Sequence, residues 1–192
     1  MKKCIYMICF GIIFLGTSSF ASMQQRSFWI DLKPQQALFW GADFFPGIAL
    51  DANFSVQRHL IKLTGAYADD DLLFEIDFTT PARQLTSLTV SYGYIFNTGK
   101  VLYTVNLAIG RAHYVARGNR IEDTSSLYMN WITPTSYEKI EHTGTIFKFP
   151  ASVHYRFADA FALGAFVAPF IVDGIAGIEA GLAVSLGYLW KK

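Results

Sequence analysis

Apolar and polar side chains alternate with a period of two along most of the chain. In residues 47–57, Ile48, Leu50 and Phe54 fall on one face, and Asp51 and Asn53 fall on the other. Successive side chains of a β-strand point to opposite faces, so this period predicts strands with one apolar and one polar face. The pattern predicts eight strands, over 28–33, 47–57, 60–67, 86–96, 101–110, 145–157, 161–171 and 177–190.

The composition of the two faces favours a barrel in lipid over a soluble sheet protein. Hydrophobic residues make up 52% of the 192 residues and aromatic residues 16%, whereas charged residues make up only 16%. A soluble domain usually carries about 25% charged residues. The polar face holds small residues with single charges, which suits the interior of a transmembrane barrel. The high hydrophobicity excludes disorder, and a net charge of +1 argues against binding to nucleic acid.

The N-terminus has the features of a secretory signal peptide. A basic start is followed by an apolar run over 4–16 and by the small residues Ser19 and Ala21. We therefore predict a signal peptide over 1–21 and a mature barrel domain over 22–192. Both cysteines of the chain lie in the segment that would be removed, which leaves no thiolate for a disulfide or a metal site.

The connections between the predicted strands differ in length at the two ends of the barrel. Three are tight (57–59, 97–100 and 158–160), three are long (34–46, 69–85 and 115–144), and the last, 173–176, is short. Outer-membrane barrels have short periplasmic turns and longer extracellular loops. Outward aromatic residues gather at the predicted turn end, where rings favour the headgroup level: Tyr94, Phe96, Tyr103, Tyr155, Phe157, Phe161, Tyr188 and Trp190. Pro150 and Pro169 are interpreted as bulges near a rim, because a closed barrel has no edge strand.

The polar face predicts a set of titratable groups inside the barrel: Asp31, Asp51, Lys62, Lys148, His154, Arg156 and Glu179. An eight-stranded barrel is filled by its own side chains, and buried charges must be paired. This favours a structural network over the alternative, a gate or narrow ion path. We also expect arginine to be tolerated better at the lumen position Ser185 than at the outward position Leu182.

A second candidate site is an acidic patch in the second long loop: Asp69, Asp70, Asp71, Glu75 and Asp77. Long loops on a rigid scaffold are where binding residues usually lie. The patch suits a divalent cation or a basic partner. The alternative is a solvated acidic loop without a ligand.

No catalytic, metal or cofactor site is predicted. The four histidines show no metal-ligand spacing, and the chain lacks the His-x-Ser motif of lipid A deacylases. A Ser/His/Asp set can be drawn in almost any chain, so such a combination carries little weight. An enzyme that modifies lipid therefore stays the least favoured alternative.

The pattern resembles small eight-stranded outer-membrane barrels, the class of the outer-membrane protein A transmembrane domain. Residues 92–96 (Tyr-Gly-Tyr-Ile-Phe), Gly110 and 137–140 (Tyr-Glu-Lys-Ile) are similar to uncharacterised barrel proteins of Gram-negative bacteria. Residues 179–186 resemble the C-terminal signal read by the barrel-assembly machinery. The resemblance implies a fold and a location in the outer membrane, and it assigns no functional residue.

These observations together predict a non-enzymatic outer-membrane protein, either envelope-structural or binding a surface ligand through its loops. Its expected partners are outer-membrane lipid and, during biogenesis, the assembly machinery. A narrow, porin-like channel is the main alternative.

Overall fold

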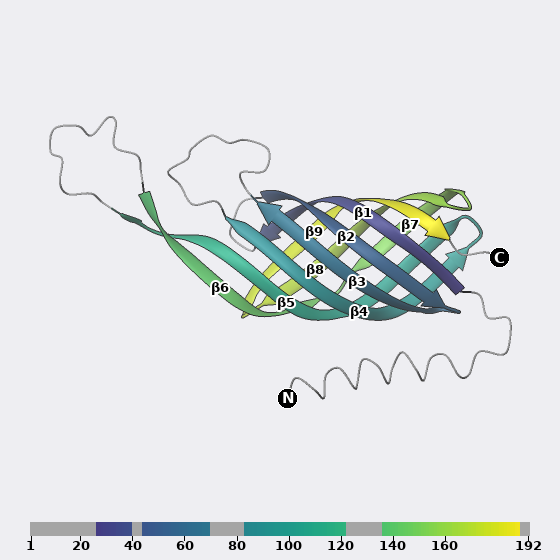
Figure 1. Cartoon of the computed structure of the whole chain (residues 1–192), viewed down its shortest axis with the longest axis horizontal. Helices are drawn as coiled ribbons and strands as arrows, with labels where there is room; N and C mark the ends of the chain where they lie inside the picture. Colours follow the sequence, from purple (N-terminus) through teal and green to yellow (C-terminus); the bar gives the residue numbers. More distant parts are fainter. Residues whose placement is uncertain (1–25, 40–43, 70–82, 122–135, 189–192) are drawn as a thin grey trace.

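The computed structural model describes residues 26–39, 44–69, 83–121 and 136–188 (Figure 1). The predicted signal peptide lies outside the described residues. All regular structure in the described residues is β: β1 (Arg26–Phe39), β2 (Phe44–Val56), β3 (His59–Asp69), β4 (Gln84–Thr98), β5 (Val101–Ile121), β6 (Ser136–Lys148), β7 (Ala151–Ala158), β8 (Phe161–Val172) and β9 (Ile175–Tyr188). Within these residues, no helix is long and apolar enough to cross a membrane.

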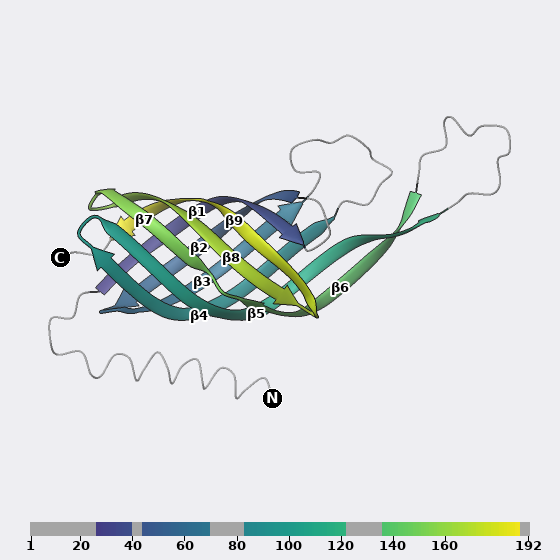
Figure 2. The same cartoon turned by 180° about the vertical axis from the view of Figure 1, so that it is seen from behind.

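The sheet closes on itself into a barrel. Apart from β6 and β7, strands that are consecutive in sequence pair antiparallel, and β1 also pairs with β9, from Phe28 opposite Tyr188 to Phe39 opposite Gly177. β6 and β7 lie in line between β5 and β8, as two halves of one wall strand. The barrel therefore has eight wall strands, which confirms the predicted up-and-down architecture (Figures 1 and 2).

The prolines interrupt hydrogen bonding without shifting the register. Lys148 lies opposite Phe170 and Ala151 opposite Val167, so the register between this wall strand and β8 is the same on both sides of Pro150. Phe149 N donates to Pro169 O at 2.9 Å. The prediction of bulges at Pro150 and Pro169 is wrong, because a proline removes one ladder hydrogen bond while leaving strand alignment intact. Register shifts occur elsewhere, at 117–120 and 156–158.

The predicted faces are confirmed. Outward side chains are large, apolar and exposed: Leu182 is 65% exposed and Leu88 59%. Inward side chains are small or polar and buried, and Asp31 and Asp51 have no exposed surface. This inverted arrangement, apolar outside and polar inside, is that of a transmembrane barrel.

Two of the predicted long loops are mostly strand. β1 and β2 pair over most of 34–46, and β5 and β6 pair over much of 115–144, forming a hairpin that projects beyond the barrel (Figures 1 and 2). Alternation weakens above the bilayer because lipid no longer selects apolar residues there, whereas backbone pairing continues. The link after β8 is the two-residue turn Asp173-Gly174, in which both residues have positive φ, as a type I′ turn requires.

Aromatic side chains form a belt at the turn end of the barrel, as predicted. Tyr94, Phe96 and Tyr103 are exposed there, and the Tyr155 and Phe157 rings meet edge-on with centroids 4.9 Å apart. Phe161 lies against Phe157, with centroids 6.0 Å apart. The side chain of Tyr188 and the whole of Trp190 lie outside the described residues.

We predict that Leu182→Arg destabilises the barrel by about 2–4 kcal/mol, because Leu182 lies mid-strand on the lipid face of β9. Ala176→Arg, on the same face but at the loop end of β9, should cost about 0–1 kcal/mol. Urea titration of the heat-modifiable folded band in phospholipid vesicles measures both. Ser185 is completely buried in the lumen, so an arginine there would also have to displace packed side chains. The expectation that arginine is tolerated better at Ser185 than at Leu182 stays a prediction. Equal losses at Leu182 and Ala176 would contradict this placement.

Candidate functional site

The interior of the barrel, the lumen, has a polar middle between two apolar layers. Trp29, Leu60, Ile95, Leu102 and Ala162 form the layer at the turn end. At the loop end a second layer is made by Ala37, Phe45, Ala68, Leu85, Ala112, Ile146, Phe170 and Val172. The polar groups between the layers are thereby held away from bulk solvent at both ends.

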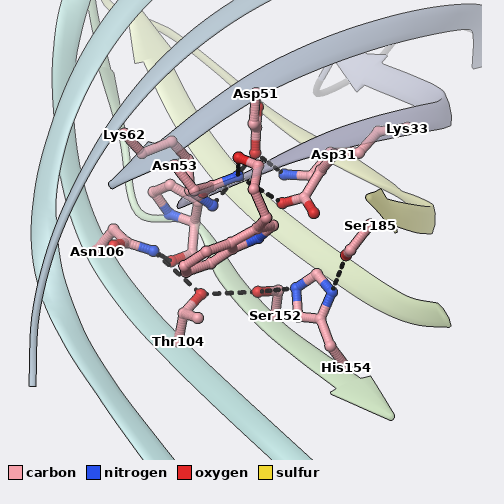
Figure 3. A network of polar contacts seen from close by, with 12 residues as sticks. Asp31, Lys33, Asp51, Asn53, Lys62, Thr104, Asn106, Ser152, His154 and Ser185 are labelled. Atoms are coloured by element: carbon pink, nitrogen blue, oxygen red, sulfur yellow. Dashed lines mark hydrogen bonds and ion pairs between the residues drawn. The ribbon is translucent and has the colours of Figure 1, made fainter. Parts of the chain in front are cut away.

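One cluster of charges in the polar middle is centred on Asp51 of β2. Its carboxylate forms ion pairs with Lys33 of β1 and with Lys62 of β3, the latter at 3.2 Å. Next to it, Asn53 Nδ2 donates to Asp31 Oδ2 at 3.0 Å (Figure 3). The Lys33 ammonium also lies 4.4 Å from the centroid of the Phe166 ring, a cation–π contact.

A second cluster joins opposite walls of the barrel. Lys148 Nζ lies 2.6 Å from Glu179 Oε1 and donates to Ser87 Oγ at 3.0 Å. Both charged side chains are 3% exposed. A cavity of about 20 Å³ lies between the two clusters, lined by Lys33, Gln35, Lys62, Lys148 and Glu179 among others. This is room for about one water molecule.

His154 of β7 joins a chain of hydrogen bonds with hydroxyl and amide side chains. Its Nδ1 lies 2.9 Å from Ser185 Oγ and its Nε2 2.8 Å from Ser152 Oγ. Ser152 continues to Thr104 at 2.7 Å, and Asn106 Nδ2 donates to Thr104 Oγ1 at 3.2 Å (Figure 3). Because the imidazole is 1% exposed and bonded at both nitrogens, this chain has the features of a structural network rather than an accessible catalytic site.

The predicted lumen residues fall into these clusters with one exception. Asp31, Asp51, Lys62, Lys148, His154 and Glu179 are all buried in the lumen, whereas Arg156 is only half-buried and lies near the turn end of β7. Sequence reasoning missed Lys33, which forms an ion pair with the central Asp51. The alternation of 28–33 already placed it on the polar face.

Only the first residue of the predicted acidic patch lies in the described structure. Asp69 ends β3 and accepts hydrogen bonds from Tyr67 Oη at 2.5 Å and from Gln84 Nε2 at 2.9 Å. Its carboxylate is therefore already engaged within the wall. Asp70, Asp71, Glu75 and Asp77 lie outside the described residues, so the patch stays a prediction.

The β5–β6 hairpin is the second feature with functional potential. β5 pairs with β4 only as far as Val115, and β6 pairs with β8 only over Ile146–Lys148. Beyond these points each hairpin strand has one backbone edge that is not paired within the described sheet. On the hairpin, Lys139 Nζ lies 2.7 Å from Glu141 Oε1, and this charged hydrogen bond lowers the pKa of the Glu141 carboxyl.

Solved structures with the same fold place this architecture among known proteins. Neisserial surface protein A is 12% identical, with a TM-score of 0.55 over 85% of this chain and 97% of that chain. The attachment invasion locus protein Ail of Yersinia pestis is 11% identical, with a TM-score of 0.52 over 86% of this chain and 99% of that chain. The chain has the fold of the small eight-stranded outer-membrane barrels, as the sequence resemblance predicted. No protein-family model and no curated protein sequence matches it.

We predict that Glu179→Gln strongly destabilises the barrel, by about 3–5 kcal/mol, because it leaves the buried Lys148 ammonium without its counter-ion. The double variant Lys148→Met/Glu179→Leu should recover most of this loss, since it removes both charges. Urea-induced unfolding of the folded band provides the measurement. Glu141→Gln, which breaks the exposed pair with Lys139, is the matched control and should leave the midpoint unchanged. A double variant as unstable as Glu179→Gln alone would refute the pairing argument.

Proposed function

We propose that the chain is a non-enzymatic protein of the outer membrane that presents the β5–β6 hairpin at the cell surface as a binding element. The observation that carries this proposal is the hairpin itself. β5 spans 21 residues, whereas a tilted strand needs roughly 9–11 to cross a bilayer. The surplus extends the hairpin well beyond the rim (Figures 1 and 2).

The hairpin edges that are not paired within the described sheet support a role in binding. A strand edge presents a row of backbone N–H and C=O groups, which an extended segment of another protein can pair with by adding a strand. Exposed charges, such as Glu138 and Lys139, accompany these edges and add polar contacts. The barrel below provides a rigid base for such an element.

The filled lumen favours this function over the channel alternative. Conduction would require a path through both apolar layers, which contain large side chains such as Trp29 and Phe45. The charges between them are paired with one another, with Asp51 of β2 between Lys33 and Lys62 on the two neighbouring strands. An envelope-structural role shares the same fold and differs only in requiring no ligand at the hairpin.

The orientation of the hairpin is tested by cysteine labelling of intact cells. We expect Glu138→Cys, on the hairpin, to react with a membrane-impermeant maleimide, because its side chain is exposed and the proposed orientation puts the hairpin outside the cell. The unmodified chain gives a low background, since its only two cysteines lie in the predicted signal peptide.

Lys100→Cys is the matched control, because Lys100 is exposed in the turn at the opposite end of the barrel. It should react only after the outer membrane is disrupted. Labelling of Lys100→Cys but not of Glu138→Cys on intact cells would reverse the orientation and refute the proposed function.

A further inference from the structure

A groove crosses the outer wall of the barrel near its loop end. It has a volume of about 720 Å³ and runs across strands β1 to β6. Leu32, Leu50 and Leu88 border it toward the turn end, and Ile48 and Tyr67 border it toward the loops. These side chains face outward, so the groove opens toward lipid and not toward the lumen.

The groove exists because its floor lacks a side chain at one position. Gly65 of β3 lies in the outward row between Leu50 and Leu88. A Cβ added to Gly65 would have nothing within 4 Å, whereas one added to the inward Gly110 would lie 2.0 Å from Leu88 O. Inward glycines such as Gly110 are required by packing. Gly65 is not, and a strand interior normally favours a β-branched or aromatic residue at such a position.

One end of this apolar groove is polar. Arg111 and His113, both on the outward face of β5, line it together with Thr143 of β6. His113 Nδ1 lies 2.9 Å from Thr143 Oγ1, which fixes the imidazole. The side chain of Arg111 is exposed, and among the described residues it has no ion pair or hydrogen bond.

The position of Arg111 along the strand places it at the membrane surface. It lies ten residues after Val101, the first residue of β5 at the turn end. Ten residues extend about 33 Å along a strand and, at a tilt of about 40°, rise about 25 Å, the height of the apolar band. Gly65 follows His59, the start of β3, by only six residues, so the floor of the groove lies at the depth of acyl chains.

We propose that this groove binds a lipid A molecule of the outer leaflet, with one acyl chain over Gly65 and a phosphate on Arg111 and His113. The two ends of the groove are complementary to the two parts of a lipid A molecule. An apolar trough takes a hydrocarbon chain, and a guanidinium in a region of low dielectric binds a phosphate through two hydrogen bonds. The choice of lipid A rests on the proposed function, because the loop end faces the outer leaflet only in that orientation.

Native mass spectrometry of the detergent-purified folded protein tests the proposal. The probes are lipid A with two phosphates, dephosphorylated lipid A and phosphatidylglycerol. We expect the protein to retain diphosphorylated lipid A and to bind the other two about tenfold more weakly. Arg111→Gln should weaken binding of diphosphorylated lipid A about tenfold, the loss expected for one hydrogen bond between charged groups.

Matched variants separate this site from general effects of charge and surface shape. Gly65→Leu fills the groove and should also reduce binding several-fold, while the free space above Gly65 leaves folding intact. Arg58→Gln, in a turn at the opposite end, and Ala165→Leu, on the lipid face of β8, should bind lipid A like the unmodified protein. All variants are first checked for the heat-modifiable folded band.

Three results would overturn the proposal: unchanged binding by Arg111→Gln, an equal loss in Arg58→Gln, or phosphatidylglycerol binding as tight as that of lipid A. Since the assay is performed in detergent, it measures the groove independently of orientation in the cell. Reversed cysteine labelling would refute the proposed function and, with it, the outer-leaflet occupant. Expected labelling without selective lipid A binding would refute the groove proposal alone.

Discussion

Closure of the hydrogen-bonded wall is the constraint on which the rest of the structure depends. In a lipid environment no water is available to satisfy backbone N–H and C=O groups, so a sheet must not have an open edge. The pairing of β1 with β9 removes the two edges that an eight-stranded sheet would otherwise have. Once the wall is closed, the alternation of side chains divides every strand into a lipid face and a lumen face. The small diameter of eight strands then forces the lumen to be filled.

The prolines show that this wall tolerates the loss of single ladder hydrogen bonds. Pro34, Pro150 and Pro169 all lie within wall strands, and each lacks the N–H that a ladder bond requires. The register is nevertheless the same on either side of Pro34, with Leu32 opposite Val184 and Gln35 opposite Gly181. The many remaining hydrogen bonds fix the alignment, so a single missing bond does not produce a bulge.

The fold was predictable from the sequence because lipid imposes the same pattern on every strand: apolar residues face outward and alternate with small or polar residues that face the lumen. The outward position of Leu182 and the inward position of Asp51 follow from period two alone. Lys33 was missed in the lumen network because Pro34 follows it and suggested the start of a loop, although the wall accommodates that proline. The β5–β6 hairpin was missed for a different reason. Above the bilayer the two faces of a strand no longer differ sharply in environment: His113 and Tyr114, adjacent in sequence, are both partly buried. The alternation of apolar and polar residues that reveals a strand therefore fades there.

The division between lumen and exterior also determines where function can reside. In the lumen, charges are matched to one another: Asp51 pairs with two lysines, and Lys148 pairs with Glu179. Such groups neutralise each other inside the barrel. Because they are buried, an external partner cannot contact them. Arg111 differs, because it stands on the outer wall beside a groove. An exposed charge next to lipid is costly unless an anion accompanies it, and the membrane surface is where lipid phosphates provide one.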